Sequence, residues 1–112
     1  MTILRIQWCE PWVEVSDGAA RRKLERELKR ELAPPHPLFG RSVEAVARRI
    51  DRDDVLFAIN NGSELAVVHL TWTSSPPDSP PWPAARVFAS VDEFVQQCLI
   101  PDHANFTDDT PE

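Results

Sequence analysis

The sequence contains few glycines and few cysteines. Only three glycines occur, Gly18, Gly40 and Gly62, and each stands alone. A glycine-rich phosphate loop of the P-loop or Rossmann type is therefore excluded. Cys9 and Cys98 form no C-x-x-C pair, so we expect two packed thiols rather than a disulfide.

Long apolar runs are also missing. No segment is long and apolar enough to span a bilayer, and the opening MTILRIQWCEPW lacks a basic stretch followed by a continuous apolar one. We therefore expect a cytoplasmic protein that does not bind membranes. The net charge of −6 repels phosphate backbones and anionic lipids, so nucleic acid is not an expected ligand and cationic partners are favoured.

Metal and cofactor signals are weak. His36, His69, His103 and Cys98 follow no recognised ligand spacing. We therefore expect neither a metal nor a cofactor.

The length and composition fit one globular domain. The chain has 112 residues, of which 42% are hydrophobic and 27% charged, as in ordinary soluble proteins. We expect a single domain over residues 1–103 and a loose acidic tail over 104–112.

The first fifteen residues allow two interpretations. Leu4, Ile6 and Trp8 alternate as in a strand, but Pro11 interrupts the segment. Residues 1–15 are therefore either an edge strand or an extended arm that docks on the core.

Residues 17–32 predict a first helix. Ser16 or Asp17 can cap it, and it ends before Pro34. Its apolar stripe consists of Ala20, Leu24, Leu28 and Leu32. Six basic and three acidic residues lie between Arg21 and Glu31, which suggests either a basic patch for an acidic partner or a solvated face. The interleaved glutamates favour the solvated face.

The next apolar segment predicts a second helix. Ser42 is placed to cap it, and Val43, Val46, Ala47 and Ile50 follow the spacing of one buried helical face.

Residues 53–72, DDVLFAINNGSELAVVHLTW, predict a β-hairpin with its turn at Asn61-Gly62. A two-residue and a four-residue loop give the same register, in which Asp54 lies opposite His69. A bulge would instead bring Asp53 or Val55 opposite the histidine.

The remaining segments complete the predicted fold. Residues 74–83, SSPPDSPPWP, predict a loop, which is either a polyproline ligand for another protein or, as we favour, an ordered loop anchored by Trp82. ARVFA (85–89) predicts a third strand. Ser90 and Glu93 form a capping box for a third helix that ends near Pro101.

Together these elements predict an α+β fold in the order ααβββα, with three helices on one face of a three-stranded antiparallel sheet. The opposite sheet face would be partly open. We expect this face to carry Leu56, Val67, His69 and Thr71.

The candidate catalytic residues are Asp54, His69 and Thr71. Asp54 can orient His69 as a general base, with Thr71 as a hydroxyl on the same face. Residues two apart on a strand project side by side about 7 Å apart, so direct activation of Thr71 is not expected. We favour a structural role, in which Asp54 satisfies a half-buried imidazole.

Four quoted segments resemble a protein family. HPLFG, ARRIDRDDVLFAI, AVVHLTW and FASVDEF are similar to a family of small uncharacterised bacterial proteins, over roughly residues 36 to 99. The resemblance implies a bacterial, cytoplasmic, stand-alone domain and carries over no activity, cofactor or catalytic residue. By analogy at the level of class, small acidic α+β proteins include accessory and immunity-type binders.

We therefore predict a non-enzymatic protein-binding module. Four tryptophans occur in this short chain, and tryptophan is enriched at binding hot spots. The candidate partner-binding residues are Trp72, Trp82 and His36. An acid-base enzyme or hydrolase using Asp54 and His69 is the alternative, and either a monomer or a homodimer is compatible with both.

Overall fold

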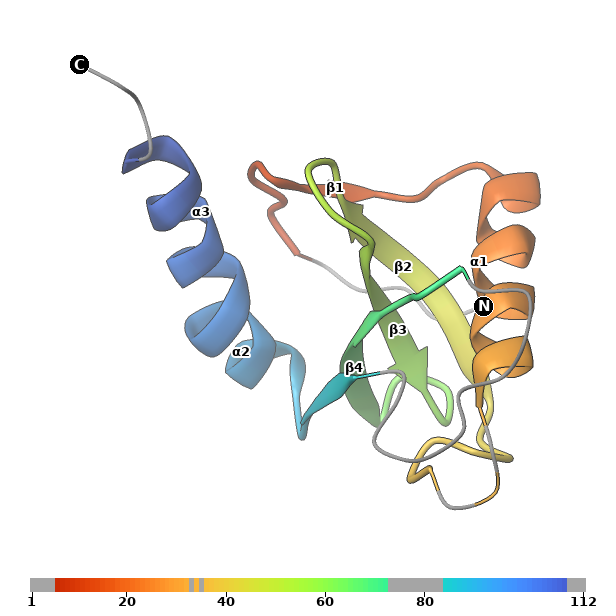
Figure 1. Cartoon of the computed structure of the whole chain (residues 1–112). Coiled ribbons are helices and arrows are strands. Elements are labelled where there is room, and N and C mark those ends of the chain that lie inside the picture. The colour runs from red at the N-terminus through yellow and green to blue at the C-terminus, as the bar shows by residue number, and fades with distance from the viewer. Residues whose placement is uncertain (1–5, 33, 35, 73–83, 109–112) are drawn as a thin grey trace.

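The computed structural model describes residues 6–32, 34, 36–72 and 84–108. Its centre is an antiparallel sheet with the strand order β1-β2-β3-β4-β5 (Figure 1). The strands are β1 (Trp12–Glu14), β2 (Val43–Arg49), β3 (Asp54–Ile59), β4 (Glu64–His69) and β5 (Ala85–Phe88).

Helices cover both faces of the sheet. Helix α1 (Gly18–Glu31) packs on one face. The other face is covered by a continuous helical segment (Figure 1). This segment comprises α2 (Val91–Phe94), the π-helical turn η1 (Val95–Leu99) and α3 (Ile100–Asp108).

The prediction of three helices on one face of a three-stranded sheet is wrong. The described part of the chain instead forms two helical segments on opposite faces of five strands. The sheet face expected to be partly open is covered by the C-terminal segment, so that Leu56 and Val67 are buried.

The main error lies in the segment predicted as a second helix, which is strand β2. Val43, Ala45 and Ala47 are buried along it, whereas Ile50 is exposed. The sequence VEAVARR fits a period of two as well as it fits helical spacing. Tertiary pairing decides between them, because β2 is hydrogen-bonded to β1 on one side and to β3 on the other.

The sheet has a hydrophobic core on each face, and a bulge in β2 directs side chains of this strand into both of them. Ala45 lies opposite Phe57 and Ala47 opposite Leu56, so Val46 is the extra residue. Ala45 therefore packs in the core under α1, whereas Ala47 packs in the core under the C-terminal helical segment.

Side chains of helix α1 bind the backbone of β2 at Ala45, which lies outside the segment of β2 that pairs with β1. The N-cap is Asp17, whose carboxylate accepts a hydrogen bond from the Ala20 N–H at 2.9 Å. One turn apart on the helix, Glu25 accepts from the Ala45 N–H at 2.9 Å and Arg21 donates to the Ala45 carbonyl at 3.1 Å. These two side chains satisfy backbone groups that a further strand would otherwise pair.

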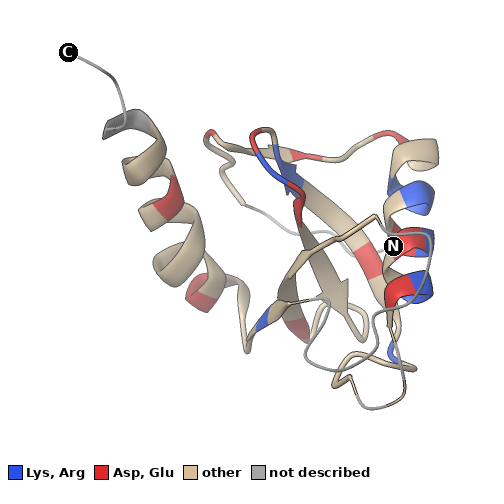
Figure 2. Cartoon of the chain, viewed as in Figure 1, with Lys and Arg blue, Asp and Glu red and all other residues tan. Residues whose placement is uncertain are grey.

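The charges of α1 are interleaved along the helix (Figure 2). Arg21 also lies 3.6 Å from Glu44, and Arg30 pairs with Glu27. This arrangement matches a solvated helical face better than a uniform basic patch.

The predicted β3–β4 hairpin is present with the predicted register. Ile59 pairs with Glu64 and Asp54 with His69. The four-residue alternative for the loop is the one present, and Asn60, Asn61 and Gly62 adopt φ angles of 51°, 64° and 91°. The positive φ predicted for Asn61-Gly62 therefore extends to Asn60. Of the two interpretations of residues 1–15, the edge strand is present over Trp12–Glu14. The third strand predicted from ARVFA is β5.

The C-terminal helical segment starts at the predicted cap and continues past its predicted end. The Ser90 hydroxyl accepts a hydrogen bond from the Glu93 N–H at 3.1 Å. Pro101 does not stop the helix, which runs to Asp108 and so includes part of the tail expected to be loose. In a regular helix the ring of Pro101 would collide with the carbonyl four residues earlier. The wider π-helical turn lies directly before it.

Candidate functional site

The register of the hairpin places Asp54 and His69 side by side. Nδ1 of His69 lies 2.7 Å from Oδ1 of Asp54. The imidazole side chain is 48% exposed and the carboxylate side chain 17%. Arg52 lies 4.0 Å from the second oxygen of Asp54. The carboxylate therefore orients an imidazole that solvent can reach.

This pair borders a small surface pocket of about 180 Å³ at the junction of β4 and β5. The other lining residues are Val67, Ala84, Ala85 and Arg86. The backbone N–H of His69 donates to the carbonyl of Ala84 at 2.9 Å, which fixes the histidine against the start of β5.

Thr71 does not join the pair, and the prediction that it shares the face of His69 is wrong. Its hydroxyl donates to Oε1 of Glu31 at 2.9 Å, on helix α1. The strand ends at His69, and Trp72 adopts a φ of 56°. Strict alternation of side chains therefore ends before Thr71, and its hydroxyl is engaged away from the imidazole.

Glu31 is a buried polar residue that the sequence analysis did not identify. Its carboxylate is fully buried and accepts hydrogen bonds from the backbone N–H groups of Thr71 and Trp72 at 2.9 to 3.1 Å. Burial raises the pKa of Glu31, and a hydrogen bond with Glu27 raises it further. The spacing of Glu31 in the sequence indicates its burial, because Glu31 lies three residues after Leu28 and therefore on the apolar stripe of the helix.

The three candidate partner-binding residues lie in different environments. Trp72 is 41% exposed, and the Lys23 ammonium lies 5.8 Å from its ring centroid. His36 is only 5% exposed, and its Nδ1 accepts a hydrogen bond from the Leu38 N–H at 3.1 Å. Trp82 and the rest of the proline-rich loop 74–83 lie outside the described residues. The structure therefore does not bring Trp72 and His36 together as one exposed surface.

The outer strand β5 lies beside the Asp54–His69 pair. It pairs with β4 on one side and has no strand on its other side among the residues described. Val87 is 44% exposed. Arg86 is also exposed and lies 5.0 Å over the ring of Phe88, and it forms no ion pair with a described residue. The other outer strand is β1, and the part of β2 that extends past β1 is covered at Ala45 by side chains of α1.

The described residues contain no cluster of three or more His, Cys, Asp or Glu side chains able to hold a metal ion. Within the same residues, no helix has the length and apolar character required to cross a membrane. Cys9 and Cys98 are both free thiols.

The chain was compared with protein-family models, with curated proteins and with solved structures, and none of the three comparisons gave a match.

Proposed function

We propose that this protein is a non-enzymatic protein-binding module that contacts its partner along strand β5. The observation that carries the proposal is the position of β5 at the end of the sheet, with exposed Arg86 and Val87. An extended segment of a partner can add to such an edge through main-chain hydrogen bonds. The short strand offers four residues, so side-chain contacts must supply the specificity.

The resemblance to small bacterial proteins supports a cytoplasmic setting and an accessory or immunity-type role. The partner is a different protein, and pairing of β5 with a second copy of the chain is a competing outcome.

The test places a photo-crosslinking amino acid at Val87 and, as a control, at Val13, an exposed valine on β1. In a lysate of the source organism, we expect a discrete adduct from position 87 and none from position 13. In the purified complex, amide hydrogen exchange in β5 should slow, because strand addition protects edge N–H groups. Substitution Val87→Lys should abolish binding, whereas Val13→Lys should not.

Three outcomes would overturn the proposal. They are adducts that form equally from both positions, β5 amides whose exchange is unchanged in the complex, and crosslinks that join two copies of this chain. Sedimentation of the purified protein separates the last outcome from the others, because a homodimer forms without lysate.

The second candidate function is an acid-base enzyme that uses His69, and the 2.7 Å contact with Asp54 favours it. An oriented, accessible imidazole can act as a general base. Against it, the hydroxyl of Thr71 is held by Glu31. If the pair is catalytic, His69→Ala abolishes turnover of a screened ester, amide or phosphoester and leaves the melting temperature unchanged. A lower melting temperature with no turnover by the native protein assigns the pair to structure.

A further inference from the structure

The turn between α1 and β2 holds an aromatic ring at the surface. The N–H groups of Phe39 and Arg41 donate to the carbonyls of His36 and Leu38 at 3.0 and 3.1 Å. Leu38 and His36 are buried beneath the turn, whereas Phe39 is 50% exposed. The hydrogen bonds therefore fix the backbone that carries the Phe39 ring outside the core.

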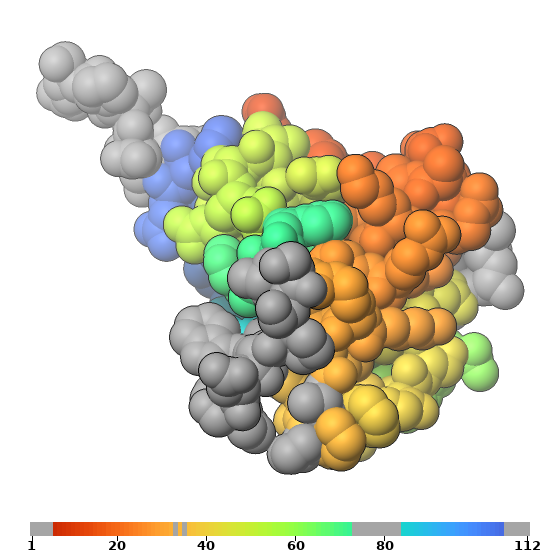
Figure 3. Space-filling view, turned by 45° about the vertical axis from the view of Figure 1, so that its right-hand side comes forward, coloured from red at the N-terminus to blue at the C-terminus, as the bar shows by residue number. Residues whose placement is uncertain are grey.

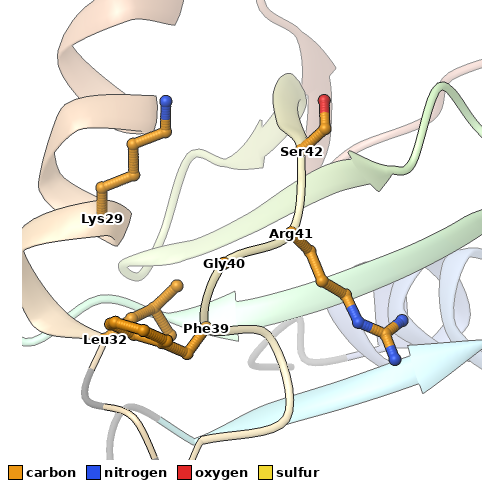
Figure 4. A pocket seen from close by; sticks show the side chains of 6 residues that line it. All are labelled: Lys29, Leu32, Phe39, Gly40, Arg41 and Ser42. Atoms are coloured by element: carbon orange, nitrogen blue, oxygen red, sulfur yellow. The ribbon is translucent and has the colours of Figure 1, made fainter.

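A surface pocket of about 560 Å³ lies beside this ring. It is lined by Lys29, Leu32, Phe39, Gly40, Arg41 and Ser42 (Figure 4). All of its lining residues except Leu32 are exposed, so the pocket is open to solvent. A methyl group added at Gly40 would meet no atom within 4 Å, so the wall is open at that point. The surface of α1 and that of the following turn adjoin on the same side of the molecule (Figure 3).

The pocket has an apolar end and a polar end. Figure 4 shows the side chains of Leu32 and Phe39 together, with the tips of Lys29 and Ser42 directed to the opposite end. The side chain of Arg41 points away from both and pairs with Glu64 at 2.8 Å.

The polar end is suited to one negative charge. Lys29 forms no ion pair with a described residue. Glu25, one turn earlier on the helix, accepts a hydrogen bond from the Ala45 N–H at 2.9 Å. The six lining residues include no acidic side chain, although the net charge of the chain is −6. Lys29 lies in the last turn of α1, where the helix dipole stabilises a cationic side chain.

We propose that this pocket binds a small amphipathic carboxylate. The carboxylate pairs with the Lys29 ammonium and accepts a hydrogen bond from the Ser42 hydroxyl, and the apolar body lies against Leu32 and Phe39. The site shares no residue with β5, so it does not depend on the partner contact proposed above.

The test is a titration of the isotope-labelled full chain with octanoate, followed by amide NMR shifts. We expect saturable shifts centred on Lys29 and residues 39–42. Octylamine and 1-octanol, which have the same apolar chain without the negative charge, should bind at least about tenfold more weakly.

Two substitutions examine the two ends of the pocket. Lys29→Gln and Phe39→Ala should each weaken octanoate binding about tenfold. Lys23→Gln is the matched control, because it removes the same charge from the same helix at a residue that faces Trp72. It should leave the affinity within about twofold.

The proposal is overturned if octanoate causes no saturable shift below about 10 mM, if octylamine binds equally well, or if Lys23→Gln weakens binding as much as Lys29→Gln. Melting curves of all variants establish that they are folded. If Phe39→Ala is unfolded, the comparison of the two lysine variants still decides the outcome.

Discussion

Nε1 of Trp12 donates a hydrogen bond to Oδ2 of Asp102 at 2.9 Å, which joins the first strand to the last helix. The same carboxylate accepts a hydrogen bond from the Cys98 thiol at 3.3 Å and lies 3.4 Å from Arg49. Trp12 and Arg49 are both buried. Asp102 therefore satisfies polar groups from β1, β2 and its own helical segment, which buried donors require.

Removal of this carboxylate should destabilise the protein. Asp102→Ala leaves the indole N–H without an acceptor and Arg49 with Asp51 as its remaining salt-bridge partner. We expect the free energy of unfolding to fall by about 2 to 3 kcal/mol, measured by denaturant titration. Asn105→Ala, an exposed change on the same helix, should alter it by less than about 0.5 kcal/mol. Equal effects of the two substitutions would contradict this role for Asp102.

The Cys98 thiol should be chemically inert in the folded protein. Burial raises its pKa to about 12, and the neighbouring Asp102 carboxylate contributes in the same direction. Since the thiolate is the reactive form, Cys98 in a Cys9→Ser variant should react with a thiol reagent at pH 8 at least about a hundredfold more slowly than in denaturant. The Cys98→Ser variant retains the partly exposed Cys9 and serves as the comparison. Fast labelling of Cys98 without denaturant would refute the prediction.

Glu31 should make stability depend on pH in a defined direction. Burial raises its pKa in the folded state above the ordinary 4.5, so the folded protein binds this proton more tightly than the unfolded chain does. The associated stability is fully present below pH 4.5 and is lost as the pH rises through the raised pKa.

The variant Glu31→Gln mimics the protonated side chain and should lack this loss. The melting temperature of Glu31→Gln relative to the native protein should therefore increase between pH 4 and pH 7. Glu31→Ala removes the acceptor of the Thr71 and Trp72 N–H groups and should cost about 2 to 3 kcal/mol. A difference between the glutamine variant and the native protein that does not change with pH would contradict the assignment.

The hairpin turn should require glycine at position 62. Its φ of 91° lies in the region that L side chains rarely adopt. Gly62→Ala should therefore lower the free energy of unfolding by about 1 to 2 kcal/mol. Asn61→Gly is the control, because the φ of 64° at that position is accessible to both residue types. Thermal melts provide the measurement, and an alanine variant as stable as the native protein would show that the turn can change conformation without cost.

Local chemistry predicted the parts of this fold that depend on short-range geometry. The Asn61-Gly62 pair specifies a tight reversal, and that reversal fixes which side chains of β3 and β4 lie opposite each other. The Asp54–His69 contact followed from this register alone. The sequence also predicted helix caps at Ser16 or Asp17 and at Ser90, because a cap residue binds helical N–H groups only three residues away. The structure has the caps at Asp17 and Ser90.

The parts that failed depend on contacts between distant segments. The segment from Val43 to Arg49 is compatible with both periodicities, and only its pairing with β1 and β3 selects the strand. Thr71 was expected to share a face with His69, but Glu31, forty residues earlier, binds its hydroxyl and backbone. Long-range hydrogen bonds of this kind have no signature in a local window of sequence.

The π-helical turn Val95–Leu99 sets the angular phase of the C-terminal helix. The Ile100 N–H bonds to the Val95 carbonyl, five residues earlier instead of four. The wide turn accommodates one extra residue, and regular α-helical winding over the same number of residues would rotate every later side chain by about 100° about the helix axis. Asp102 would then face away from Trp12. The contact between the last helix and the first strand thus depends on the widened winding of this one turn.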